Sequence, residues 1–167
     1  MKIIILFLIL ILLSGCGIFN PNNFVLPNDV EFINTIETLN IPQKIGNYMR
    51  ENFTYEAHRF FSLTPYELWS TQKGDCNDFS TFGTFVAHYH GYETYQIRII
   101  QDDGIIHWLG VYKENIYSFT DCQNYFPDYE TFREIVERNY LDKFADWASY
   151  QVYDYDMNLI EKIYASL

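Results

Sequence analysis

The spacing of apolar residues changes once along this chain, and the change limits which folds it can adopt. Ahead of Gly91 the spacing is helical, most clearly at Phe79, Phe82, Phe85, Val86 and Tyr89. After Gly91 the pattern has a period of two, as in a half-buried strand, at Tyr95, Ile97 and Ile99. We therefore expect an α+β domain in which N-terminal helices pack on an antiparallel sheet.

Capping signals predict where the first helices begin. Asn28 or Asp29 caps a helix through about residue 40, and Pro42 suits the first turn of a second helix that ends near residue 52. Thr64, with a proline next and a carboxylate three residues on, forms a capping box for a short helix that carries Trp69. The second half of the chain predicts strands at about 105–112, 116–124 and 149–153, and helices at about 129–139 and from 157 onward.

The N-terminus predicts export and lipid attachment. The apolar run at 3–13 is too short to cross a bilayer about 30 Å thick, so residues 1–15 resemble a signal peptide. The sequence Leu-Ser-Gly-Cys at 13–16 resembles the bacterial lipobox, in which Cys16 receives the lipid. We expect residues 16–28 to be a tether and 29–167 one domain. The protein would then sit outside the cytoplasm, lipid-anchored to a bacterial cell or outer membrane.

The charge of the chain excludes one class of partner. It carries 22 acidic against 11 basic residues, a formal net charge of −11. This balance repels phosphate backbones, so we expect no nucleic acid partner. No motif predicts a cofactor or a metal site: His88 and His90 lie at a helix C-terminus without a third ligand, and His58 has no evident partner.

Cys76 combines two features of a nucleophile. Asp75 caps the helix that ends at Gly91, so Cys76 falls in its first turn, where free backbone N–H groups and the helix dipole favour a thiolate. Asp75 and Asp78 oppose this effect, and an imidazolium partner is needed to offset them. His107 is the candidate. In an exported protein a Cys76–Cys122 disulfide is the alternative.

The hairpin after His107 tests whether the imidazole has an orienting acid. If Lys113–Asn115 forms a three-residue loop, paired residue numbers add to 228 and His107 lies directly opposite Asp121. A two-residue loop places Cys122 there instead and turns Asp121 to the other face. In a regular strand Asp121 and Cys122 cannot both face His107.

These residues resemble the transglutaminase-like superfamily. Its core motif is similar to Gly-Asp-Cys-Asn-Asp-Phe-Ser at 74–80, and its second motif, a strand histidine near a tryptophan, is similar to His107-Trp108. The third motif, an aspartate on the next strand, matches Asp121, and residues 42–55 resemble the helix that precedes the first motif. The likeness covers roughly residues 40–125 and implies a papain-like core.

The resemblance also implies chemistry. Cys76 would be the nucleophile, His107 the base and acid, and Asp121 the residue that holds the imidazole tautomer. A thioester acyl-enzyme would be resolved by an amine or by water, on a protein or peptide substrate. Trp69 or Gln72 is a candidate for a second oxyanion donor. Two alternatives stay open: a catalytically silent binding module of the same fold, and a Cys-His cell-wall peptidase.

Overall fold

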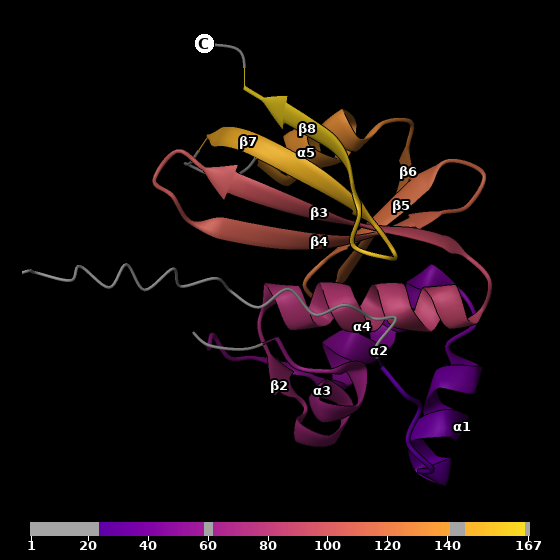
Figure 1. Cartoon of the computed structure of the whole chain (residues 1–167). Coiled ribbons are helices and arrows are strands. Elements are labelled where there is room, and N and C mark those ends of the chain that lie inside the picture. Colours follow the sequence, from indigo (N-terminus) through magenta and orange to yellow (C-terminus); the bar gives the residue numbers. More distant parts are fainter. Residues whose placement is uncertain (1–23, 59–61, 141–145, 166–167) are drawn as a thin grey trace, which may run out of the picture.

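The computed structural model describes residues 24–58, 62–140 and 146–165, and these form three layers. Four helices and a short strand pair lie on one face of a six-stranded antiparallel sheet, and a fifth helix covers the other face (Figure 1). The predicted α+β class, with N-terminal helices on an antiparallel sheet, is confirmed. The signal segment 1–15 and Cys16 lie outside the described residues. Within them no helix is long and apolar enough to cross a membrane.

The helices begin where the capping signals place them. Asp29 accepts hydrogen bonds from the first turn of α1, and Thr64 and Asp75 each form a capping box, at the starts of α3 and α4. Pro42 opens α2. The bounds are α1 Val30–Thr38, α2 Pro42–Asn52, α3 Pro65–Thr71 and α4 Cys76–Tyr89, with the parallel pair β1 Thr54–Tyr55 and β2 Lys73–Gly74.

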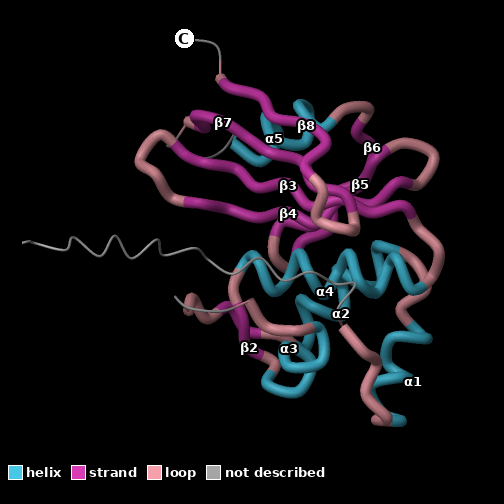
Figure 2. Tube along the Cα trace, viewed as in Figure 1, coloured by secondary structure: helices cyan, strands magenta, loops and turns pink. Residues whose placement is uncertain are grey.

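The large sheet has the strand order β6-β5-β4-β3-β7-β8, with every neighbouring pair antiparallel (Figure 2). Apolar side chains of the N-terminal helices pack on the face of the sheet that α4 covers. The other face packs on α5 through a separate apolar cluster. The bounds are β3 Glu93–Gln101, β4 Ile106–Lys113, β5 Tyr117–Asp121, β6 Asn124–Tyr129, α5 Phe132–Tyr140, β7 Trp147–Asp154 and β8 Leu159–Tyr164.

Two predicted elements of the second half are wrong. The segment expected as one strand at 116–124 is split by a two-residue turn, so a further strand, β6, precedes α5. The helix expected from Met157 is the edge strand β8, whose residues pair with β7. A turn closed by Asp154 and Asn158 reverses the chain there, and pairing to β7 overrides the local preference.

The predicted register of the β4–β5 hairpin is also wrong, by two residues. Leu109 pairs with Asp121 and Lys113 with Tyr117, so paired numbers add to 230. Lys113 stays in the strand, with its Nζ 3.9 Å from the centre of the Tyr117 ring, and the loop is 114–116. The loop length is still odd, so Asp121 keeps the face that His107 uses. It lies diagonally across from His107 instead of directly opposite.

Candidate functional site

Cys76 is the first residue of α4, and its position is set by the residues around it. Asp75 Oδ1 accepts hydrogen bonds from the N–H groups of Asn77 and Asp78, and Asp78 Oδ2 accepts from the Asp75 N–H at 2.8 Å. This reciprocal capping fixes the first turn of α4. The Cys76 side chain is buried, with 9% of the residue exposed. Cys76 is a thiol, not half of the Cys76–Cys122 bridge that the sequence left open.

The thiol contacts the sheet at Trp108, the residue that follows His107. Its sulfur accepts a hydrogen bond from the backbone N–H of Trp108, the next residue on β4. Trp108 has no partner on β5, because that strand ends at Asp121 opposite Leu109. Because β5 ends early, the backbone N–H of Trp108 is available to the Cys76 sulfur.

Burial dominates the acidity of Cys76. It raises the pKa of Cys76 to about 12, with the charges of Asp75 and Asp121 acting in the same direction. The N–H groups of Trp108 and Asn77 lower this pKa but do not offset the burial. The expected helix-start effect is present and is outweighed. The thiol is protonated at neutral pH, so its attack on a carbonyl requires a base.

His107 and Asp121 form a hydrogen-bonded pair. His107 Nε2 lies 2.8 Å from Asp121 Oδ1, and the two side chains are 14% and 21% exposed. An ionised carboxylate only accepts, so Nε2 carries the proton and Nδ1 is left with the lone pair. Asn139 of α5 donates to Asp121 Oδ2 at 2.8 Å. The pair is thus anchored from both sides of the carboxylate.

Cys122 lies beside this pair, contrary to the prediction that it turns away. A ring nitrogen of His107, a carboxylate oxygen of Asp121 and the sulfur of Cys122 are all within 4.8 Å of one another. The prediction assumed a regular strand, but strand alternation stops at Asp121. Cys122 is the first residue of the β5–β6 turn and has a φ of 50°, which redirects its side chain.

The two proposed oxyanion donors have other surroundings. Trp69 packs against Phe32 and Tyr66, and its indole N–H bonds the hydroxyl of Tyr48. Gln72 is an exposed left-handed residue at the end of α3, with a φ of 57°. The structure brings neither side chain into a described contact with Cys76.

A second histidine–carboxylate cluster lies at the start of α4 and was missed by sequence reasoning. His58 Nε2 is 2.5 Å from Asp78 Oδ2 and 3.9 Å from Asp75 Oδ2, and Asp78 Oδ1 accepts the Leu63 N–H at 2.7 Å. Burial lowers the pKa of His58, but the hydrogen bond and charge of Asp78 outweigh it and raise that pKa. His58 and Asp78 are 20 residues apart, and no local pattern connects them.

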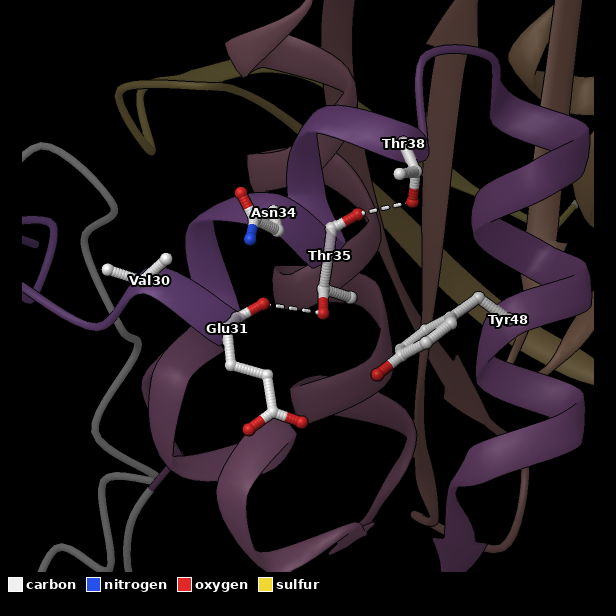
Figure 3. A pocket seen from close by; sticks show the side chains of 6 residues that line it. All are labelled: Val30, Glu31, Asn34, Thr35, Thr38 and Tyr48. Carbon is white, nitrogen blue, oxygen red and sulfur yellow. Dashed lines mark hydrogen bonds between the residues drawn. The ribbon is translucent and has the colours of Figure 1, made fainter.

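A hollow of about 510 Å³ lies between α1 and α2 (Figure 3). The hydroxyls of Thr35 and Thr38 bond carbonyls of their own helix, at 2.8 Å each. The lining of the hollow shares no residue with the Cys76 site. It consists of Val30, Glu31, Asn34, Thr35, Thr38 and Tyr48.

Comparisons with known proteins give distant likenesses. No family model matches this chain, and neither does any curated protein. Among solved structures, the chain is similar to Legionella pneumophila LapG in its calcium-bound form, with 13% identity, a TM-score of 0.48 and coverage of 72% of this chain and 70% of LapG. The EGTA-treated form of LapG gives the same identity and TM-score, over 82% of this chain and 74% of that one.

Proposed function

We propose that this protein is a cysteine enzyme that forms a thioester with an acyl group of a protein or peptide substrate. Cys76 is the nucleophile, His107 the base and Asp121 the residue that orients the imidazole. One observation carries the proposal: Asp121 holds His107 through Nε2 while the Cys76 sulfur is bonded to the next backbone N–H along β4. The transglutaminase-like motif at 74–80 supports the same roles.

The reaction follows from the proton positions. His107 Nδ1 takes the proton of the Cys76 thiol as the sulfur attacks the carbonyl carbon, and Asp121 stabilises the imidazolium that results. The imidazolium then protonates the leaving amine, and the carbon–nitrogen bond breaks to leave a thioester. A second amine gives a crosslinked product, and water gives hydrolysis. The Cys76 N–H is our choice of oxyanion donor, because Asp75 already engages the N–H groups of Asn77 and Asp78.

Alkylation of Cys76 by iodoacetamide tests the thiol–imidazole pair. We expect His107→Gln to slow the reaction near neutral pH by roughly 100-fold or more, because the base that takes the thiol proton is lost. His88→Gln is the matched control, since His88 is exposed and stacks on Tyr155. Equal rates in the parent and both variants would show that His107 does not act on Cys76.

The acceptor is identified by two assays run together. The parent protein and Cys76→Ala are each given a fluorescent primary amine with a glutamine-containing protein, and separately a panel of unlabelled peptides. Amine incorporation that requires Cys76 indicates acyl transfer, and peptide cleavage or deamidation that requires Cys76 indicates hydrolysis. Activity that survives in Cys76→Ala contradicts the proposal.

The silent binding module has one observation in its favour, the burial of Cys76 at 9% exposure. In that case substrate protein would bind without any covalent adduct. Intact-mass measurement of the parent after incubation with an acyl donor separates the two functions. A thioester mass shift supports the enzyme, whereas binding with an unchanged mass supports the module.

We further propose that Cys16 carries a lipid and holds the domain at the outer side of a bacterial membrane. The lipobox-like residues 13–16 and the tether 16–28 support this, and residues 1–23 lie outside the described structure. In detergent phase partition, the parent should enter the detergent-rich phase and Cys16→Ser the aqueous phase. Cys122→Ser, the same change elsewhere, should partition like the parent.

A further inference from the structure

Cys122 occupies a backbone position that a cysteine rarely takes. It begins a two-residue turn between β5 and β6, bounded by the Asp121–Asn124 pair, and its φ is 50°. The first central position of such hairpin turns, where φ is positive, favours Gly, Asn or Asp. Other residues with positive φ are uncommon and tend to occur where the surrounding structure or a function requires them. The Gln123 side chain bonds the Phe53 carbonyl and ties this turn to the helical layer.

The turn places the Cys122 sulfur beside two side chains of the types that bind metal ions, His107 and Asp121. A nitrogen of His107, an oxygen of Asp121 and the sulfur of Cys122 lie within 4.8 Å of one another, and all three residues are half-buried. We propose that these three residues bind Zn²⁺ as a regulatory ion. Imidazole, carboxylate and thiolate are the ligand types that Zn²⁺ prefers, and a tetrahedral ion needs their ligand atoms about 3.5 Å apart. Binding through His107 Nε2 therefore requires that its distance of 2.8 Å from Asp121 Oδ1 lengthen by less than about 1 Å.

The charges of the site balance. Zn²⁺ displaces the proton of the Cys122 thiol, so one thiolate and one carboxylate neutralise the two positive charges of the ion. One proton is released to solvent, and no oxidation state changes. Neutral His107 supplies a lone pair and leaves the charge unaltered. A neutral complex suits a half-buried position better than separate charges do.

Zinc at this position would switch off the thiol chemistry, an inference that rests on the proposed function. Coordination through His107 Nδ1 removes the lone pair that takes the Cys76 proton. Coordination through Nε2 breaks the hydrogen bond to Asp121. Either mode leaves Cys76 without an oriented base, so bound Zn²⁺ acts as a reversible inhibitor.

The cluster of His58, Asp75 and Asp78 is a useful comparison, because its ligand atoms also lie within 4.8 Å of one another. It has no sulfur, and the Asp78 side chain is fully buried, at 0% exposed. The Asp121 side chain is 21% exposed and His107 14%. His107 and Asp121 are therefore both open to an ion from solvent, whereas Asp78 is not.

Cobalt binding tests the site without any need for catalysis. Co²⁺ replaces Zn²⁺ and reports a thiolate ligand by a sulfur-to-metal charge-transfer band. We expect the full-length Cys76→Ser protein to show this band with one ion per chain, and to lose it when Zn²⁺ is added. The additional change Cys122→Ser should abolish the band. It should also weaken Co²⁺ binding by roughly 100-fold or more, because loss of a residue that only hydrogen-bonds to a metal ligand already lowers metal affinity by roughly 10- to 100-fold.

The control and the second measurement separate this inference from the proposed function. His58→Gln in the Cys76→Ser background should keep the band, because its cluster holds no sulfur. A band that persists without Cys122, or no band at all, would overturn the site. With Cys76 present, Zn²⁺ should slow iodoacetamide labelling of Cys76 in the parent and not in Cys122→Ser. If the band forms and labelling ignores Zn²⁺, the zinc site stands and its coupling to Cys76 is rejected.

Discussion

The carboxylate of Asp121 is shared by two residues, and this gives Asn139 a part in positioning the imidazole. Oδ1 faces His107, and Oδ2 accepts from the Asn139 side chain at 2.8 Å. Asn139 is 8% exposed, so solvent cannot readily replace its amide. Loss of that amide leaves a partly buried carboxylate oxygen short of a donor and free to rotate away from His107.

Asn139→Leu therefore has two expected effects. The free energy of unfolding should fall by about 1–3 kcal/mol, because a buried hydrogen bond to a charged group is lost. Alkylation of Cys76 should also slow, most strongly near neutral pH, where the thiol depends on His107, and less in alkali. Urea unfolding and a labelling rate against pH measure the two. A variant that is less stable but has an unchanged pH profile would assign Asn139 a purely structural role.

The control for Asn139 is a surface pair with the same chemistry. Asn158 Nδ2 donates to Asp154 Oδ2 at 3.0 Å, and Asn158 is exposed. Asn158→Leu should change the free energy of unfolding by less than about 1 kcal/mol, because water replaces the lost donor. It should leave the labelling of Cys76 unchanged.

At the scale of elements, the start of α4 depends on one buried carboxylate. Asp78 accepts from the Asp75 N–H, the Leu63 N–H and His58, and burial raises the pKa of Asp78. Asp78→Asn keeps the shape of the side chain but loses the charge and at least one acceptor. We expect the free energy of unfolding to fall by about 2–4 kcal/mol in urea titrations.

The capping box of α3 provides the matched control for Asp78. Glu67 occupies the same position in its box and accepts the Thr64 N–H at 2.8 Å, but it is exposed. Glu67→Gln should lower the free energy of unfolding by less than about 1 kcal/mol. Equal losses in the two variants would mean that the contacts to His58 and Leu63 add nothing to capping.

α4 packs so closely on β4 that position 83 requires glycine. A Cβ added there would overlap the hydroxyl oxygen of Tyr112, which is fully buried and lies 2.8 Å from Thr120 Oγ1. Ala in place of Gly ordinarily stabilises a helix by about 1 kcal/mol. Here Gly83→Ala should instead lower the free energy of unfolding, by about 1–3 kcal/mol.

A double-mutant cycle measures this clash directly. Tyr112→Phe removes the hydroxyl, so Gly83→Ala should cost less in the Tyr112→Phe background than in the parent, by about 1 kcal/mol or more. Urea unfolding of the four proteins gives the coupling free energy. A coupling near zero would show that α4 shifts to accept the methyl group.

Local signals explain what the sequence could predict at this scale. The starts of α1, α3 and α4 depend on capping side chains within three residues, and Pro42 marks α2, so all four could be placed. The identity of β8 depends on pairing with β7, which only the folded sheet supplies. A helical pattern near residue 157 therefore misled the prediction.

The site shows the same division between local and distant determinants. Cys76 at a helix start and an odd hairpin loop are local features and were predicted. The offset of two residues between β4 and β5 depends on where the turn closes, and the placement of Cys122 depends on strand alternation stopping at Asp121. Asn139 is 18 residues from its partner Asp121, and His58 is 20 residues from its partner Asp78. No sequence pattern connects either pair.

At the scale of the whole molecule, aromatic burial links stability to alkaline pH. Burial, the largest cause in each case, raises the pKa of several tyrosines to about 12, namely Tyr55, Tyr125, Tyr140 and Tyr155. An unfolded phenol titrates near pH 10 and an unfolded thiol near 8.5, and burial raises the pKa of Cys76 to about 12 as well. The folded state therefore holds these protons more tightly than the unfolded state.

The sign of the pH effect follows from linkage. Groups with a raised pKa in the folded state contribute stability that is complete below their unfolded pKa and lost as pH rises toward their folded pKa. We expect the free energy of unfolding to fall steadily between about pH 9 and pH 12, first from Cys76 and then from the tyrosines. The formal net charge of −11 adds self-repulsion in the same direction.

Urea titrations across this range, with phenolate absorbance as a parallel signal, test the expectation. Tyr155→Phe removes a phenol whose pKa is raised to about 12 by burial and by the charge of Asp156. Its stability should decline less steeply than that of the parent above about pH 10, where the unfolded parent ionises this phenol and the variant cannot. Tyr164→Phe, at a side chain that is 64% exposed, should follow the slope of the parent. Parallel curves for the parent and Tyr155→Phe would exclude the Tyr155 phenol as a source of alkaline sensitivity and leave Cys76, the other buried tyrosines and charge repulsion as the causes.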